Sequence, residues 1–259
     1  YDRVGANWLG FDFARFLASS QVVVPEYNRA WILKCYYNLK KLPSVIENKP
    51  TLISDVTMPE SARKLLAEIG ENRPLILYQG VLGIDRKDVI TIIEMIAKCR
   101  PHIAILILGN QSPEVERIVA TYENVYFHPS IAAPNHLSVT ARATVGIAVY
   151  RGVGSVLGQL NAFYCAPNKI YEYARFGVPI LGNNIPGLKY SIEAAGAGLC
   201  CDMNETSVLS ALDRLLSERE RFSQCARIFY AKTDTIDQTL AVLKQVRGRD
   251  ATVCDYSGV

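Results

Sequence analysis

The chain has 259 residues, of which 49% are hydrophobic and 20% are charged, and its formal net charge is +3. This composition is typical of a globular protein with one large domain or two small ones. The basic residues are scattered and do not form a stripe with interleaved aromatic residues, so we expect no nucleic-acid partner. No apolar run reaches the roughly 18 residues that a membrane span needs. Because the first residue is Tyr1, we expect the chain to be a fragment.

The cysteines and histidines give no sign of a disulfide framework or a metal site. Seven cysteines are present, which is an odd number, and no C-x-x-C spacing occurs. We therefore expect reduced thiols and a cytoplasmic location, a location with which the absence of a signal-peptide pattern agrees. His102, His128 and His136 do not group with cysteines at the spacing of zinc ligands, so we expect no bound metal.

Residues 1–43 contain few regular elements. The stretch 22–25 predicts a short buried strand, and 27–41 predicts a helix with Trp31 and Cys35 on one face. One strand and a few helices cannot form a doubly wound sheet by themselves. We therefore interpret residues 1–43 as the end of an N-terminal acceptor domain and its linker.

From residue 44 onward, apolar strands alternate with amphipathic helices. The predicted strands are 44–50, 74–80, 102–109, 124–128, 144–150, 178–182 and 197–201, and the predicted helices are 59–70, 86–99, 112–123, 135–143, 167–177, 206–216 and two more near the C-terminus. Continuously apolar strands that alternate with helices predict a parallel sheet covered on both faces. Right-handed crossovers then give an α/β fold with a Rossmann-like doubly wound domain over residues 44–235, followed by a C-terminal helix or tail at 236–259.

The connection between Tyr150 and Pro167 is unusually long for such a fold and contains Gly152, Gly154 and Gly158. A long glycine-bearing loop at the carboxyl end of a strand is usually functional or disordered. Ligands of open parallel sheets bind at that edge, so the loop is a candidate part of a ligand site, with a plain surface loop as the alternative.

The helix predicted to begin at Pro167 carries Asn168, Lys169 and Glu172 near its start. Proline fits the first helical position, because its missing N–H has no partner there. The free amides of the first turn and the helix dipole favour an anion, and Lys169 adds a positive charge. Glu172 offers two acceptor oxygens, which suit a vicinal diol. The group therefore fits a nucleotide, with the diphosphate at the helix start and the ribose on Glu172. Taken alone, however, the group is better explained by a first-turn acid that the helix dipole favours and a solvated lysine.

A second candidate lies at residues 78–88, "YQGVLGIDRKD". A strand ends at Gly80, a loop carries Gly83, and a helix opens with Arg86 and Lys87. The G-x-G-x-x-G pattern is absent, which disfavours a dinucleotide-dependent dehydrogenase. A cation at a helix start is unfavourable unless an anion binds nearby, and an arginine can hold a diphosphate through two hydrogen bonds. Both cationic helix starts follow strands of the same sheet, so we expect them to face one crevice.

Five segments carry a resemblance to a known family: "LYQGVLGIDRKDVITIIEMI", "LILGN", "NVYFHPSI", "APNKIYEYARFGVPILGNNIPGL" and "AGLCCD". Together they resemble the donor-binding C-terminal domain of a GT-B glycosyltransferase, of the family 4-like "group 1" set. The resemblance covers residues 44–235, and "PNKIYEYARFGVPIL" is its most specific part.

The resemblance assigns roles to individual residues. It implies that Arg86, with Lys87 beside it, neutralises the leaving diphosphate without a metal, and that Glu172 binds the ribose. Many members carry a further glutamate eight positions earlier, where this chain has Tyr164, so the usual contact to the donor sugar is missing. Asn168 and Lys169 stand near that position instead.

Other polar residues at strand ends carry alternative interpretations. Asn110 and His128 either flank the base or serve as a turn residue and a packed histidine, and no histidine is expected to be a catalytic base.

The resemblance implies a hexosyltransferase-type glycosyltransferase that uses a UDP- or GDP-sugar in glycan or polysaccharide biosynthesis. Its glycan or lipid-linked acceptor is expected to bind mainly to the missing N-terminal domain, and peripheral association with the inner face of the membrane is an expectation for the longer protein. The donor-binding residues are then Gly80, Gly83, Arg86, Lys87, Asn168, Lys169 and Glu172. A GT-B-fold sugar-nucleotide epimerase and a non-catalytic nucleotide-binding module remain as alternatives.

Overall fold

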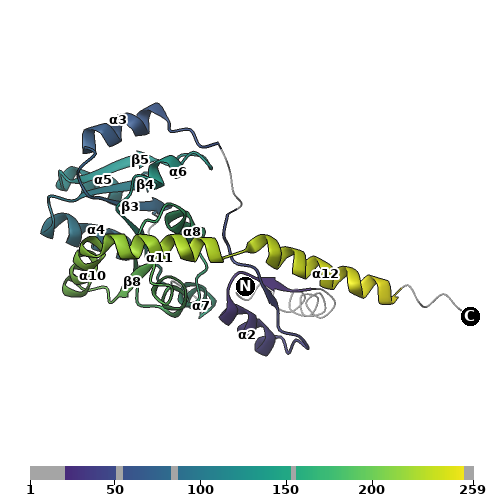
Figure 1. Cartoon of the computed structure of the whole chain (residues 1–259). Coiled ribbons are helices and arrows are strands. Elements are labelled where there is room, and N and C mark those ends of the chain that lie inside the picture. Colours follow the sequence, from purple (N-terminus) through teal and green to yellow (C-terminus); the bar gives the residue numbers. More distant parts are fainter. Residues whose placement is uncertain (1–20, 51–54, 83–86, 153–155, 254–259) are drawn as a thin grey trace, which may run out of the picture.

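The computed structural model describes residues 21–50, 55–82, 87–152 and 156–253 (Figure 1). Its main element is a parallel sheet of six strands in the order β5-β4-β3-β6-β7-β8. The strands are β3 (Leu75–Gly80), β4 (Ala104–Gly109), β5 (Val125–Pro129), β6 (Val145–Ala148), β7 (Ile180–Asn183) and β8 (Gly198–Cys201). The predicted α/β doubly wound sheet is therefore confirmed.

The strand order places a topological switch point between β3 and β6. The chain first builds outward from β3 through β4 to β5, and then returns to pair β6 with the other side of β3 through Ile76 and Leu77. In open parallel sheets, the loops at the carboxyl ends of the strands separate at such a point and leave a crevice for ligands.

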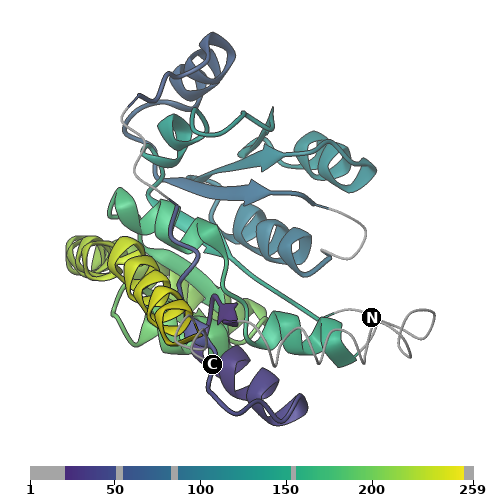
Figure 2. The same ribbon diagram turned by 90° about the vertical axis from the view of Figure 1, so that its right-hand side faces the viewer.

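Helices cover both faces of the sheet (Figures 1 and 2). They are α3 (Glu60–Ile69), α4 (Lys87–Cys99), α5 (Pro113–Thr121), α6 (Leu137–Thr140), α7 (Val156–Phe163), α8 (Asn168–Arg175), α9 (Pro186–Leu188), a π-helical segment at Lys189–Glu193, α10 (Glu205–Ser217), α11 (Arg219–Lys232) and α12 (Thr235–Val253). One core cluster joins the sheet to α4, α5 and α10, and the other joins it to α3, α8 and α11. The four inner strands, β3, β4, β6 and β7, are buried on both faces, which explains their largely apolar sequences, whereas the edge strands β5 and β8 are partly exposed.

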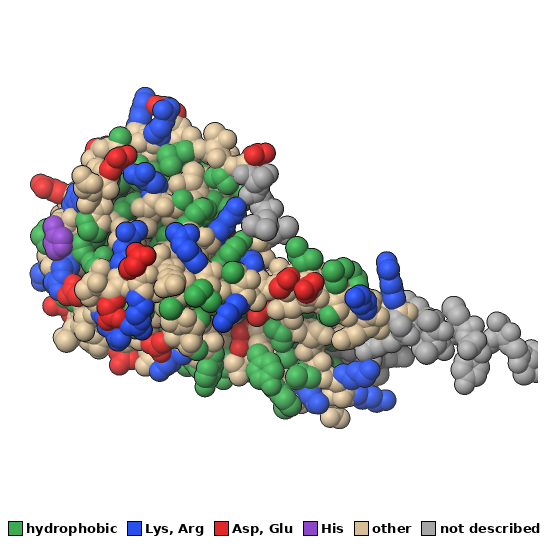
Figure 3. All heavy atoms as spheres, in the orientation of Figure 1, with side chains coloured by type: hydrophobic (Ala, Val, Ile, Leu, Met, Phe, Trp, Pro, Cys, Tyr) green, Lys and Arg blue, Asp and Glu red, His purple; other side chains and the backbone are tan. Residues whose placement is uncertain are grey.

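A smaller parallel pair, β1 (Val23–Val24) and β2 (Ser44–Val45), lies with α2 (Tyr27–Tyr36) beside α12. The backbone N–H of Glu47, just after β2, donates to the side chain of Gln238 in α12 at 3.2 Å. On the part of the molecule formed by β1, β2, α2 and α12, hydrophobic side chains are exposed among the charged ones (Figure 3). The most exposed of them on α2 and α12 are Tyr27, Trp31, Tyr36, Ile236, Leu240 and Leu243.

Several element boundaries differ from the prediction. The helix expected over 27–41 ends at Tyr36, and the strand expected over 44–50 is only Ser44–Val45. The connection from Tyr150 to Pro167 was expected to be a loop but contains α7, and α9 and the π-helical segment were not predicted. Ser112 does cap α5, since its hydroxyl accepts from the N–H of Val115 at 3.3 Å, and Pro113 is the first residue of that helix.

The described part of the chain contains six cysteines, all of them free. Burial raises the pKa of the Cys165 and Cys200 thiols to about 12 and that of Cys201 to about 11. These thiols therefore stay protonated at neutral pH and are poor nucleophiles. Within the described ranges, no group of three or more potential metal ligands occurs. No helix there is both long enough and apolar enough to cross a bilayer.

Candidate functional site

A pocket of about 340 Å³ opens at the carboxyl edge of the sheet, beside the switch point. It is lined by residues from the ends of β3 and β4, from the segment after β5, and from α8. Its lining consists of Gln79, Gly80, Leu108, Ser130, Ile131, Ala133, His136, Pro167, Asn168, Lys169 and Glu172. We call it the switch-point pocket.

Helix α8 brings three of the predicted site residues to this pocket. The prediction that Pro167 is its first helical residue was wrong, because Pro167 has extended φ and ψ of −81° and 140° and the helix begins at Asn168. A proline ring is compatible with the first helical position and with the position before it. Pro167 occupies the position before the helix, where its side chain forms no capping hydrogen bond to the first turn of α8. The first amide groups of a helix have no partner within the helix itself.

The position of α8 on the sheet is set by Tyr173. Its fully buried hydroxyl donates to the backbone carbonyl of Leu77 in β3 at 3.0 Å. The ring lies so close to β6 that a Cβ at Gly146 would be 2.6 Å from it, which explains a glycine in the middle of that buried strand. Burial raises the pKa of Tyr173 well above its ordinary value, so the hydroxyl keeps its proton and the role of Tyr173 is packing.

The carboxylate of Glu172 is held from two sides. Gln79, at the end of β3, donates from Nε2 to Oε2 of Glu172. Nε2 of His136 lies 3.3 Å from the other oxygen, Oε1. The side chains of Glu172 and His136 are 16% and 17% exposed, so the carboxylate is mostly shielded but still reaches the pocket.

Lys169 places a positive charge on the same pocket. Its Nζ lies 4.5 Å from the centroid of the Tyr78 ring and 5.5 Å from that of Tyr150. Gly80 has a φ of +140°, and a Cβ there would lie 3.1 Å from this Nζ. Glycine at this position therefore permits both the turn after β3 and the close approach of the lysine.

The structure brings together Gly80, Asn168, Lys169 and Glu172 among the residues that the sequence predicted for donor binding. Gly83 and Arg86 lie outside the described residues, so the expected crevice between two cationic helix starts stays a prediction. Lys87 is the first residue of α4, and its side chain also lies outside the described part.

Gln79 and His136 belong to the pocket but were missed by the sequence reasoning. Gln79 could have been recognised as a candidate, because it is a polar residue at the end of an apolar strand, next to Gly80. His136 was not expected to be functional. It lies close to Glu172 only because of the order of the strands in the sheet.

Asn110 and His128, each of which had two interpretations from the sequence, form contacts with nearby backbone and side-chain groups. The amide of Asn110 accepts from the N–H of Leu82 at 2.6 Å and donates to its carbonyl at 3.0 Å, which ties the segment after β3 to the end of β4. His128 is buried, and its ring nitrogens contact the Ser61 hydroxyl at 2.9 Å and the Pro129 carbonyl at 2.6 Å. These contacts agree with a turn residue and a packed histidine.

The segment before α8 is fixed by residues near the N-terminus. Nε of Arg29 in α2 donates to the carbonyl of Tyr164 at 2.6 Å, and its Nη2 donates to Asn161 Oδ1 at 2.7 Å. The side-chain amide of Asn48 donates to the carbonyl of Ala166 at 2.7 Å. Tyr164, which stands where a glutamate was expected by resemblance, therefore takes part through its backbone.

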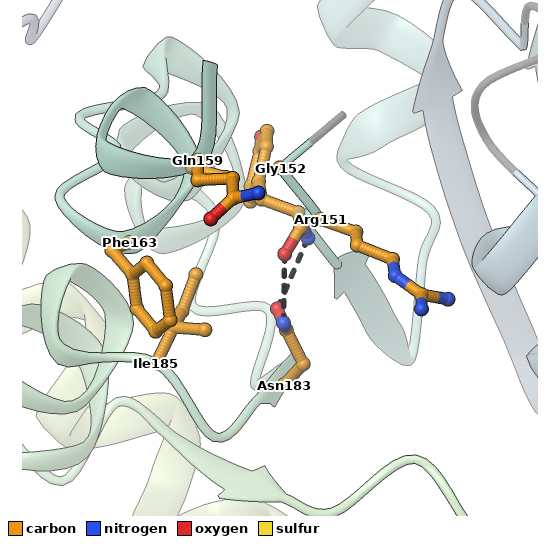
Figure 4. A pocket seen from close by; sticks show the side chains of 8 residues that line it. Arg151, Gly152, Gln159, Phe163, Asn183 and Ile185 are labelled. Atoms are coloured by element: carbon orange, nitrogen blue, oxygen red, sulfur yellow. Dashed lines mark hydrogen bonds between the residues drawn. The ribbon is translucent and has the colours of Figure 1, made fainter. Parts of the chain in front are cut away.

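A second pocket of about 340 Å³ lies at the same sheet edge, at the ends of β6 and β7 (Figure 4). We call it the α7 pocket, because Gln159, Ala162 and Phe163 of α7 line it. The side-chain amide of Asn183 bonds both the N–H and the carbonyl of Tyr150, at 3.0 and 2.8 Å. The side chain of Arg151 points away from Phe163, and it pairs with Asp88 at 2.9 Å.

No family model matches the chain, and no curated protein matches it in sequence. Solved structures do match it in fold. Sucrose-phosphate synthase from Thermosynechococcus elongatus superposes with a TM-score of 0.65 at 16% identity, over 99% of this chain and 65% of the other. HepE from Anabaena, in complex with UDP-glucose, gives a TM-score of 0.65 at 14% identity over 91% and 66%. WaaG, a glycosyltransferase involved in lipopolysaccharide biosynthesis, gives 0.60 at 16% over 86% and 62%.

These structural neighbours are glycosyltransferases of the GT-B type. The parallel sheet of six strands is consistent with one Rossmann-like half of that fold. The chain spans between 62% and 66% of the length of these three structures. At 16% identity or less, the likeness establishes the fold alone.

Proposed function

We propose that this chain is the donor-binding part of a family 4-like glycosyltransferase and binds a nucleotide-diphosphate sugar at the switch-point pocket. The observation that carries the proposal is the joint placement of Lys169, the start of α8 and the held carboxylate of Glu172 on one pocket. The cation and the helix amides suit a diphosphate, and the carboxylate suits the two hydroxyls of a ribose.

The same residues suit the chemistry of sugar transfer. When the bond between the sugar carbon and the phosphate oxygen breaks, positive charge develops on the sugar and negative charge on the leaving diphosphate. Lys169, Arg86 and the first amides of α8 stabilise that negative charge in this proposal, without a metal ion. Asn168, Gly80, Gly83 and Lys87 complete the proposed donor site.

A uridine nucleotide is the first donor to test. The Anabaena HepE structures contain UDP and UDP-glucose, and they share the fold of this chain. A UDP-hexose is therefore our first choice, with a GDP-sugar as the second. We propose that the acceptor is a glycan or a lipid-linked glycan, that it binds to a further domain, and that the product belongs to polysaccharide biosynthesis at the inner face of the membrane.

Calorimetric titration of the chain with UDP, GDP, UDP-glucose and uridine tests the proposal. We expect a diphosphate nucleotide to bind more tightly than uridine, because only the diphosphate reaches Lys169. Lys98→Ala, which removes an exposed lysine of α4, is the matched control and keeps the wild-type affinity. Absence of binding by every nucleotide diphosphate tested would contradict the proposed function.

A further inference from the structure

Glu172 is oriented by a side chain that no ligand needs to touch. Gln79 is 5% exposed and lies at the end of β3, with its amide between Glu172 and the hydroxyl of Thr140. Thr140 is fully buried in α6. Three elements distant in sequence, β3, α6 and α8, therefore meet in one chain of hydrogen bonds beside the pocket.

Two groups face the amide of Gln79 from opposite sides, the carboxylate of Glu172 and the hydroxyl of Thr140. Nε2 of Gln79 donates to Oε2 of Glu172, and the Thr140 hydroxyl donates to Oε1 of Gln79 at 2.7 Å. The opposite orientation of the amide would set Oε1 against the carboxylate, with two acceptors in contact and no proton between them. The carboxylate therefore selects the orientation, and the Thr140 hydroxyl, which also lies 3.2 Å from the His136 carbonyl, supports it from the other side.

The carboxylate keeps capacity for a ligand while it is held. Each carboxylate oxygen can accept about two hydrogen bonds. Gln79 uses one position on Oε2, and His136 faces Oε1 at 3.3 Å. One acceptor position on each oxygen is left, which matches the two neighbouring hydroxyls of a ribose.

Resting on the proposed function, we propose that Gln79, supported from the other side by the Thr140 hydroxyl, is a positioning residue that presents both oxygens of Glu172 to the ribose diol. Selectivity for a ribonucleotide over a deoxyribonucleotide then depends on Gln79 and Thr140 as well as on Glu172. A purely structural Gln79 would affect the stability of the fold but not this selectivity.

The test is the ratio of the dissociation constants for 2′-deoxy-UDP and UDP, measured by calorimetry on the full chain. Gln79→Met keeps the length of the side chain but removes its donor, and we expect it to lower the wild-type ratio by about 3- to 10-fold, the size of one hydrogen bond. The affinity for inorganic diphosphate should change by less than about twofold, because Lys169 and the start of α8 are untouched.

Thr140 provides a second, independent variant. Thr140→Val removes the hydroxyl at nearly equal volume and should lower the ratio, whereas Thr140→Ser keeps the hydroxyl and should restore the wild-type ratio. Gln21→Met is the matched control, since it removes a glutamine that bonds the Ser44 hydroxyl at 2.8 Å near β2. In a Glu172→Ala background, Gln79→Met should lower the ratio no further.

The outcomes separate this inference from the proposed function. If the wild-type chain binds UDP and discriminates against 2′-deoxy-UDP, but Gln79→Met and Thr140→Val keep the wild-type ratio, the positioning role is wrong and the proposed function stands. An equal wild-type affinity for UDP and 2′-deoxy-UDP also overturns the inference. No binding of any nucleotide overturns both.

Discussion

The switch-point pocket and the α7 pocket have the same volume of about 340 Å³ and open at the same edge of the sheet, yet they differ in chemistry. The switch-point pocket presents a lysine and a carboxylate whose surroundings hold them in place. Among the described residues that line the α7 pocket, the one charged side chain, Arg151, turns away to Asp88, so the others present amides and apolar groups. The position of charge, and not the size of a pocket, therefore identifies the candidate nucleotide site.

The difference follows from the strand order. Because β3 lies between β4 and β6, the end of β3 can meet both the segment after β5 and the start of α8. The ends of β6 and β7 line their pocket together with α7 and Ile185. Single substitutions in each pocket test whether nucleotide binding depends on the switch-point pocket and not on the α7 pocket.

The largest effect is expected at Glu172. Glu172→Ala should weaken UDP binding by about 10- to 100-fold, because hydrogen bonds to a charged group contribute about 1.5–3 kcal/mol. Calorimetry measures the loss, and a thermal melt should show that the domain stays folded. Glu68→Gln, which changes an exposed carboxylate of α3, is the control. An unchanged UDP affinity in Glu172→Ala would count against the ribose role.

Lys169→Ala should weaken UDP binding by about tenfold, which corresponds to one charge-assisted contact to the diphosphate. The affinity for uridine should stay within about twofold, because uridine carries no phosphate. Titrations with both ligands give this difference. An equal loss for uridine and UDP would show that Lys169 supports the shape of the pocket instead of binding the diphosphate.

Asn183→Ala should act on stability more than on nucleotide binding. It removes both hydrogen bonds to the backbone of Tyr150, so we expect a loss of about 1–2 kcal/mol in the free energy of unfolding. Urea denaturation measures this loss, and UDP affinity should change by less than about threefold. A large loss of UDP affinity with an unchanged free energy of unfolding would indicate that the nucleotide binds in the α7 pocket instead.

Phe163→Ala should have the smallest effect. Phe163 is 47% exposed at the α7 pocket and contributes nothing to the proposed nucleotide contacts. UDP affinity should therefore stay within about twofold and stability within about 1 kcal/mol. A tenfold loss of UDP affinity in this variant would contradict the distinction between the pockets.

Most of the fold could be predicted because the inner strands are largely apolar and because helices α3, α4, α5 and α8 have a clear amphipathic period. The helix α7 could not, because Gly158 and the neighbouring glycines of its connection made that stretch resemble a loop. The boundary at Pro167 was missed because a proline suits both the first helical position and the position before it.

The site was predictable only where one segment carries it. Asn168, Lys169 and Glu172 follow one another on α8, so their common surface could be inferred from helical spacing. Gln79 and His136 lie 93 and 36 positions away from Glu172 (172 − 79 and 172 − 136) and meet it only through the strand order and the anchoring of α8 by Tyr173. The sequence does not specify those contacts in any local pattern.

A crystal structure of this chain with UDP would show directly whether the switch-point pocket binds the nucleotide. We expect the ribose hydroxyls within hydrogen-bond distance of both oxygens of Glu172, and the diphosphate beside Lys169 at the start of α8. A nucleotide in the α7 pocket, or a ribose without contact to Glu172, would contradict this expectation.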